Sequence, residues 1–262
     1  MNSMVLYVDL NADMGESFGR YKIGYDEVLV KYVTSANIAC GFHAGDPLVM
    51  RKTIKLCINH NVAVGAHPGF PDLMGFGRRV MEVKPEELEA YLIYQVGALM
   101  GMARSLGVEV QHIKVHGALY NMAWTRADYA EAIAYAVKSL KSNLILVAPY
   151  NSAMAKKAEE IGIPVAYEGF IERGYTKEGR LVPRGKPGAL IHDPEEAANR
   201  AIRMISEGKV KTVEGIDIDI IVHTLCIHSD SPNADKIAST VRKRLEEVSI
   251  KVVPLRQIIK IK

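Results

Sequence analysis

The chain has 262 residues, 48% of them hydrophobic and 24% charged, which is enough to bury a large core and suits one α/β barrel domain. Its 33 basic and 30 acidic side chains leave a net charge of only +3, and the basic residues are scattered, so we expect neither nucleic acid nor a membrane surface as a partner. No apolar run approaches the roughly 20 residues that a membrane-spanning helix needs.

Apolar strand-like segments alternate with longer helical patterns from end to end, which is typical of repeated βα units around a parallel sheet. The predicted strands lie near residues 4–11, 35–41, 62–67, 112–116, 144–149, 164–168 and 218–228, with 250–254 as a candidate short eighth. Helix starts are predicted at Asp46-Pro47, Lys84-Pro85, Thr125, Asn151 and Asp193-Pro194. The sequence therefore predicts an α/β fold, a seven-stranded (β/α) barrel that forms a single domain, residues 1–262.

The stretch Arg173–Pro187, RGYTKEGRLVPRGKP, interrupts this alternation between the sixth strand and the next helix. Its glycines, its prolines and the alternating YTKEGRLV pattern predict a small hairpin or flap near 173–187. A flap over a site and a surface loop without a role fit this pattern equally well.

One face of several predicted strands is polar. Strand side chains alternate between two faces, and the polar sets are Asp9, Asn11 and Asp13, then Asn37 and His43, then His67, then His112, Lys114 and His116. A parallel strand between helices and a core is apolar on both faces, so a polar face needs another explanation. If the strands close into a barrel, the polar sets point inward and converge at the C-terminal mouth, where such barrels build active sites. The predicted convergent set is Asp13, His43, His67, His116, Glu168 and His228.

Three inward histidines beside Asp13 are costly to bury unless the site is polar for a purpose. We therefore predict Asp13, His43, His67 and His116 as the catalytic set. Two kinds of chemistry are open. A divalent metal fits Asp and His ligands, with Asp13, His43 and His67 as the first candidates. Metal-free acid–base catalysis is the alternative, with a histidine or Asp13 activating water.

Other polar residues have simpler interpretations. His112 lies deeper along its strand, which favours a structural hydrogen bond, and structural roles are also expected for His60, His192 and His223. Lys114 either pairs with a strand carboxylate or steadies an anionic substrate, and the sequence favours neither.

Several familiar motifs are missing. The sequence has no G-x-x-x-x-G-K-[ST] loop, no G-x-S-x-G elbow and no H-E-x-x-H helix, which argues against a self-contained nucleotide hydrolase, a serine esterase and a zincin. Cys40, Cys57 and Cys226 are odd in number and widely spaced, which indicates a reducing, cytoplasmic location. The N-terminal residues enter a strand pattern at once, so no signal peptide is expected.

Long polar motifs follow one another through nearly the whole chain. They are DLNADMGES (9–17), ANIACGFHAGDP (36–47), GAHPGFPD (65–72), GFGRR (75–79), QVGAL (95–99), KVHGALYN (114–121), RGYTKEGRLVPR (173–184), GALI (188–191) and CIHSD (226–230). Together they resemble the LamB/YcsF family, the family of the A-type component of bacterial and archaeal 5-oxoprolinase.

The resemblance implies a distorted TIM-type barrel related to the glycoside hydrolase/deacetylase folds. It implies an ATP-dependent reaction that opens 5-oxo-L-proline to L-glutamate, in a complex with two partners, the B and C subunits. ATP is then a co-substrate of the complex, which would explain the missing phosphate loop. The substrate-binding candidates are Asn11, Lys114, Glu168, Arg173 and His228, with Lys114 and Arg173 on the substrate carboxylate. The alternatives are a stand-alone metal-dependent amidase or deacetylase, and a non-catalytic substrate-binding subunit.

Overall fold

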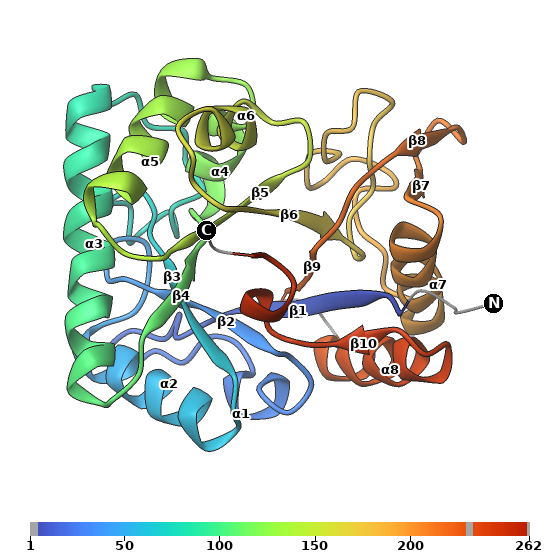
Figure 1. Ribbon diagram of the computed structural model, residues 1–262, viewed down its shortest axis with the longest axis horizontal. Coiled ribbons are helices and arrows are strands. Elements are labelled where there is room, and N and C mark those ends of the chain that lie inside the picture. Colours follow the sequence, from blue (N-terminus) through green and yellow to red (C-terminus); the bar gives the residue numbers. More distant parts are fainter. Residues whose placement is uncertain (1–4, 229–232, 261–262) are drawn as a thin grey trace.

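A computed structural model describes residues 5–228 and 233–260, so Met4 of the predicted first strand and Ser229 and Asp230 of the CIHSD motif lie outside the described residues. Within the described part, seven parallel strands close into a barrel, because the last of them pairs with both its predecessor and the first (Figure 1). In barrel order they are β1 (Tyr7–Met14), β2 (Ser35–Ala39), β3 (Ala63–His67), β4 (Val110–Ile113), β5 (Ile145–Pro149), β6 (Val165–Phe170) and β9 (Thr224–Ile227). The predicted seven-stranded α/β barrel is confirmed.

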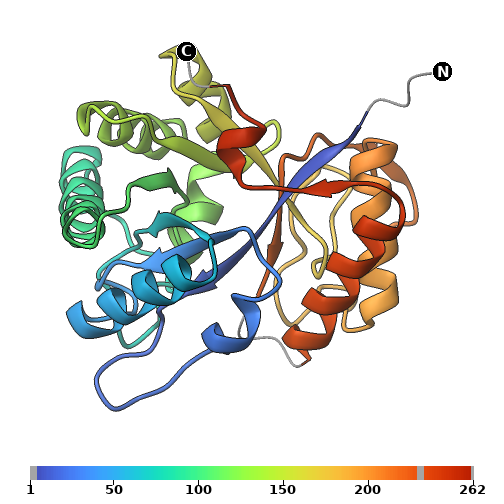
Figure 2. The same ribbon diagram turned by 60° about the horizontal axis from the view of Figure 1, so that its bottom comes forward.

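Helices form a layer outside the barrel, with α2, α3 and α5 on one side and α7 and α8 on the other (Figures 1 and 2). The helices are α1 (Asp26–Leu29), α2 (Pro47–Asn59), α3 (Pro85–Ser105), α4 (Gly117–Ala123), α5 (Ala127–Ser139), α6 (Ala153–Glu160), α7 (Pro194–Ser206), α8 (Ala234–Glu247) and the 3-10 turn η1 (Leu255–Gln257). No helix in residues 5–228 and 233–260 is long and apolar enough to cross a membrane.

The predicted helix caps are right where a carboxylate precedes proline. The Asp46 carboxylate accepts from the Leu48 and Val49 amides, and Asp193 caps α7 in the same way. The predicted start at Asn151 is wrong, because that residue adopts a left-handed φ of 60° and Ser152 caps α6 instead. The start at Thr125 is also displaced, since α5 begins at Ala127.

The predicted strand 218–228 is two elements. Its first part, β8 (Asp217–Asp219), pairs antiparallel with β7 (Lys209–Lys211) as a ribbon outside the barrel, and only β9 joins the barrel. The ribbon places lysines directly opposite aspartates, a favourable cross-strand arrangement that competes with barrel pairing. The candidate eighth strand is present as β10 (Lys251–Val252). It pairs with Tyr7 and Val8 of β1, whereas β2 pairs with β1 only from Asn11 onward.

The two faces of β1 divide as the alternation predicts. Val8, Leu10 and Ala12 are fully buried in the hydrophobic core, whereas Asp9 and Asn11 are buried in polar surroundings inside the barrel. The part of the barrel interior beside β1 is therefore occupied by hydrogen-bonded polar side chains, whereas Ile145, Val147, Ala166 and Leu255 form a separate apolar cluster. The free thiols of Cys40, Cys57 and Cys226 are all buried.

His112 lies inside the barrel, in the layer of polar side chains above Asp9. Its Nε2 lies 2.7 Å from the Asn37 side-chain oxygen, so the predicted structural hydrogen bond is confirmed. Burial is the main reason that the pKa of His112 is lowered to about 3. The ring fits only because Gly65 on the next strand lacks a side chain, since a Cβ there would lie 2.0 Å from the imidazole.

Replacing Asp9 by asparagine should change how stability depends on pH. Burial raises the pKa of Asp9 to about 6, although hydrogen bonds from Ser35, Thr224 and Thr34 oppose the rise. The folded state therefore holds this proton more tightly than the unfolded chain, and the resulting stability is fully present below pH ~4 and lost as pH rises through about 6. At ~1.4 kcal/mol per pKa unit the loss is about 3 kcal/mol.

Urea unfolding at pH 4 and pH 7 measures this effect. Between the two values, the wild-type unfolding free energy should fall by about 3 kcal/mol relative to that of Asp9→Asn. Equal changes in the two proteins would show that Asp9 does not hold its proton in the fold.

Candidate active site at the barrel mouth

A cavity of about 620 Å³ lies at the C-terminal ends of the strands. It is lined from the strand ends, from the first turns of α4 and from the segment 180–184. The predicted residues that line it are Asp13, His67, Lys114, His116, Arg173 and His228. His43 and Asn11 belong to the same polar region but do not line this cavity, and Glu168 lines a separate, smaller cavity.

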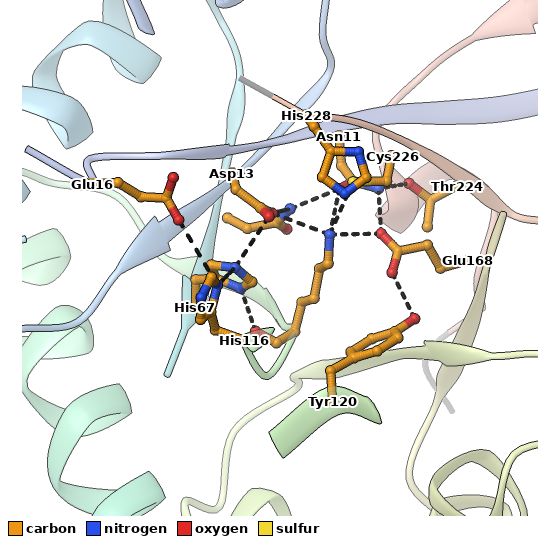
Figure 3. Close-up of polar contacts among 12 residues, drawn as sticks. Asn11, Asp13, Glu16, His67, His116, Tyr120, Glu168, Thr224, Cys226 and His228 are labelled. Carbon is orange, nitrogen blue, oxygen red and sulfur yellow. Dashed lines mark hydrogen bonds and ion pairs between the residues drawn. The ribbon is translucent and has the colours of Figure 1, made fainter. Parts of the chain in front are cut away.

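Lys114 is the centre of a polar network whose members Asn11, Asp13, Glu168 and Cys226 are labelled in Figure 3. Its Nζ lies 2.8 Å from a Glu168 oxygen and 3.1 Å from Asp13 Oδ1, and it also contacts Cys226 Sγ at 3.2 Å. The pairing with strand carboxylates, one of the two roles left open by the sequence, is therefore present. Lys114 is almost fully buried yet lines the cavity, so it also presents charge to a bound molecule.

The surroundings of Asp13 and Lys114 keep both side chains ionised. Burial acts to lower the pKa of Lys114, but Asp13, Cys226 and Glu168 together hold it well above its ordinary value. Burial likewise acts to raise the pKa of Asp13, but His67 and Lys114 hold it well below its usual range. Asp13 is therefore a carboxylate and Lys114 an ammonium throughout the neutral pH range.

Asn11 and Glu168 support this network through hydrogen bonds to neighbouring strands and to α4. The Asn11 amide accepts from Asn37 at 2.7 Å and donates to Glu168 and Thr224 at 3.2 and 2.7 Å. Glu168 in turn accepts from the Tyr120 hydroxyl at 2.7 Å. These bonds use the polar atoms of both side chains, so the geometry favours positioning of Lys114 over direct contact with a substrate.

A cluster of histidines adjoins Asp13. His67 Nε2 lies 3.3 Å from Asp13 Oδ2 and 2.9 Å from His116 Nδ1. The His43 ring stacks on that of His116, with centroids 3.8 Å apart. Burial, followed by the neighbouring histidines, lowers the pKa of His43 well below its usual range, and burial together with His67 lowers that of His116 to about 3. The strand predicted for 35–41 ends at Ala39, so His43 reaches the cluster from a turn.

Glu16 completes this cluster and was missed by the strand-based prediction. Its Oε1 lies 3.7 Å from His43 Nε2 and 3.8 Å from His116 Nδ1. Glu16 follows β1 after Gly15, whose φ of +69° turns the chain back toward the mouth. One donor atom each from Glu16, His43, His67 and His116 falls within 4.8 Å of the others, a set able to hold a metal ion.

Arg173 fixes the segment predicted as a flap. Its guanidinium donates to the Val182 and Ala189 carbonyls at 2.7 and 3.3 Å, and burial lowers its pKa to about 10. Tyr175 and Leu181 form an antiparallel bridge, as a hairpin requires. Arg180, Leu181, Pro183 and Arg184 from this segment line the cavity. The segment therefore forms one wall of the site.

His228 lies at the cavity rim, where the Glu172 carboxylate accepts from its amide at 2.8 Å and lies 3.2 Å from its Nδ1. Outside the cavity, His223 Nδ1 accepts from the Tyr167 amide at 3.0 Å, a structural role as predicted. His60 and His192 are exposed on the surface.

Fold and site together define an α/β-barrel protein with a carboxylate–lysine–histidine site at the C-terminal mouth, where barrel enzymes place their chemistry. The chain belongs to the LamB/YcsF family, whose profile matches residues 8–260, so the resemblance seen in the motifs is confirmed.

Similar proteins cover the chain almost completely. The 5-oxoprolinase A component of Pyrococcus abyssi is 54% identical over 252 residues, 96% of this chain and 99% of its own. That of Coprothermobacter proteolyticus is 54% identical over 257 residues, 98% of each chain. The crystal structure of a lactam utilization protein from Thermus thermophilus superposes with a TM-score of 0.91 at 46% identity, covering 95% of this chain and 99% of that one.

Proposed function

We propose that the chain is the A component of a 5-oxoprolinase, which opens the lactam of 5-oxo-L-proline to L-glutamate using ATP and acts with B and C subunits. The observation that carries the proposal is the ionised Asp13–Lys114 pair beside His67 at the wall of the cavity. The names of relatives that align over nearly the full chain support the substrate and the partners.

A lactam carbonyl is a poor electrophile, so the reaction needs activation. Transfer of the γ-phosphoryl group of ATP to the lactam oxygen releases ADP and makes the ring carbon electrophilic. Water then adds to that carbon, and the C–N bond breaks with its electron pair going to nitrogen, which takes up a proton. A second water hydrolyses the resulting acyl phosphate to glutamate and phosphate.

The residues at the cavity wall suit the water-addition step. His67 is oriented by the Lys114 carbonyl oxygen, 2.7 Å from its Nδ1, and its Nε2, 3.3 Å from Asp13 Oδ2, is positioned to accept the proton of the attacking water. Lys114 offers a fixed positive charge to the anionic phosphoryl group on the activated lactam oxygen. Both groups are held before substrate binds, so little reorganisation is needed.

Two arginines of the segment 173–187, Arg180 and Arg184, are the best placed to bind the substrate carboxylate. Lys114 already faces two carboxylates and Arg173 already donates to two carbonyls, whereas Arg180 and Arg184 are exposed and line the cavity. We therefore assign the substrate carboxylate to Arg180 and Arg184, in place of the Lys114 and Arg173 suggested by the family resemblance.

Arg184→Ala should raise the KM for 5-oxoproline about 10- to 100-fold, because a charge-assisted hydrogen bond contributes ~1.5–3 kcal/mol. The kcat should change little, since the carboxylate is bound equally in the ground state and the transition state. Steady-state kinetics of the assembled complex measure both constants. Lys186→Ala is the matched control, since Lys186 is exposed on the same segment but does not line the cavity.

The proposed function is tested by measuring glutamate from 5-oxoproline with the chain alone and with its proposed partners, each with and without ATP. Glutamate is expected only from the full mixture. Its absence there would refute the proposal. Glutamate from the chain alone without ATP, abolished by a chelator, would instead establish a stand-alone metal-dependent amidase, the second candidate, which the donor set around Glu16 favours.

A further inference from the structure

The histidine cluster contains two ring nitrogens whose protonation is fixed by backbone carbonyls. His67 Nδ1 lies 2.7 Å from the Lys114 carbonyl oxygen, and His116 Nε2 lies 2.8 Å from that of Phe76. A carbonyl oxygen only accepts, so both of these nitrogens carry hydrogen and donate. In a neutral imidazole the second nitrogen then bears a lone pair. When both rings are neutral, His67 Nε2 and His116 Nδ1 therefore present lone pairs to the same point.

These two lone pairs face each other at 2.9 Å. Two acceptors at this distance repel unless a proton or a cation lies between them. Donation of the remote N–H to a carbonyl is the arrangement that orients histidines as metal ligands. Two nitrogens bound to one tetrahedral ion at about 2.0–2.1 Å lie about 3.3 Å apart, close to the distance found here.

His43 provides an independent observation. Its side chain is fully buried, and neither ring nitrogen makes a hydrogen bond within the described residues. Leaving buried polar nitrogens without partners costs about 1–3 kcal/mol, so their retention calls for a ligand. The ring lies parallel to that of His116, and an imidazole lone pair lies in the ring plane. His43 must therefore turn its ring to join a shared ion, and turning it breaks no hydrogen bond.

The charges nearby favour a cation. Glu16 brings a carboxylate to within 3.7–3.8 Å of His43 and His116, and Asp13 lies 3.3 Å from His67 on the cavity side. Asp13 already pairs with Lys114, which leaves Glu16 as the carboxylate ligand of the group.

We propose that the chain binds one divalent transition-metal ion through Glu16, His43, His67 and His116. Three imidazoles and one carboxylate suit Zn²⁺ and its neighbours in the first transition row, rather than Mg²⁺ or Ca²⁺, which take oxygen ligands. The set differs from the Asp13, His43 and His67 expected from the sequence, because Glu16 replaces Asp13 and His116 joins. The site is defined by binding alone. A bound ion and the base role of His67 in the proposed lactam opening exclude each other, because both use the Nε2 lone pair.

Metal titration of the full chain tests the site. Chain stripped with a chelator should bind one Zn²⁺ by calorimetry, and Co²⁺ should give the visible absorption of a tetrahedral nitrogen–oxygen site. Glu16→Gln, which keeps the side-chain shape, should weaken Zn²⁺ binding at least about 10-fold. His60→Ala removes an exposed histidine remote in sequence from the group and should bind as wild type does.

Imidazole ¹⁵N spectra of the wild-type chain give a second readout that needs no variant. One equivalent of Zn²⁺ should shift the non-donating nitrogens of His67 and His116 and leave that of His112 in place. Equal Zn²⁺ binding by wild type and Glu16→Gln would overturn the proposal, as would unshifted His67 and His116 signals.

Discussion

Lys114→Met should lower the unfolding free energy by about 3–5 kcal/mol, because the change leaves buried carboxylates without their counter-charge. Lys114 Nζ lies 2.8 Å from Glu168 and 3.1 Å from Asp13, and the Glu168 side chain is fully buried. Urea unfolding at pH 7 measures the loss. Lys52→Met is the matched control, since Lys52 pairs with Glu27 at 2.9 Å on the surface and should cost less than about 1 kcal/mol.

A second substitution separates charge from packing. Adding Glu168→Gln to Lys114→Met removes one uncompensated charge, so the double variant should recover about 1–2 kcal/mol relative to Lys114→Met. A Lys114→Met protein as stable as wild type would contradict the buried network, and a double variant less stable than the single would show that packing, not charge, dominates.

Asp13→Asn should lower kcat of the assembled complex about 1,000-fold, with KM for 5-oxoproline changed far less. The amide cannot supply the negative charge that faces His67 Nε2 and stabilises the proton taken from water. The side-chain oxygen can still accept from Asn37, so the fold should be retained. Single-turnover and steady-state assays measure the effect.

The control for Asp13→Asn is Asp219→Asn, an exposed aspartate on β8 that should leave kcat unchanged. Circular dichroism and partner binding establish that the Asp13 variant is intact. A kcat within about 3-fold of wild type, in an intact complex, would remove Asp13 from the chemistry.

The fold and half of the site follow from strand alternation. Side chains two residues apart share a face, so Asp9, Asn11 and Asp13 could be assigned to the barrel interior from the sequence. The same rule placed His67 at the mouth and Lys114 on the inward polar face of its strand, and both line the cavity. It succeeded because a parallel strand has no other reason to carry polar groups on one face.

The rest of the site lies on turns and helix starts, where side-chain direction depends on backbone angles that alternation does not predict. Glu16 turns inward after Gly15, and Arg78 reaches the cavity after Gly77, whose φ is +63°. Tyr120 reaches Glu168 from the first turn of α4, four residues after His116. Glu16, Arg78 and Tyr120 lie in the motifs DMGES, GFGRR and KVHGALYN. These motifs identify the residues in the sequence but do not show which way their side chains point.

The splitting of 218–228 has a different origin. Its apolar run continues into β9, so periodicity alone favours one long strand. In the structure, however, Asp217 lies opposite Lys211 and Asp219 opposite Lys209 in the β7–β8 ribbon. Pairing with the neighbouring strand β7 decided the outcome, and the alternation pattern of one strand does not reveal its pairing partner.

The central claim is that the lactam is opened at the barrel mouth of this chain. The most direct test is a crystal structure of the complex that contains the Asp13→Asn chain, soaked with 5-oxoproline. We expect the lactam ring in the cavity, with its carbonyl beside Lys114 and its carboxylate toward Arg184. If 5-oxoproline were bound only on a partner protein, with this cavity free of it at saturating concentration, the proposed place of the chemistry would be wrong.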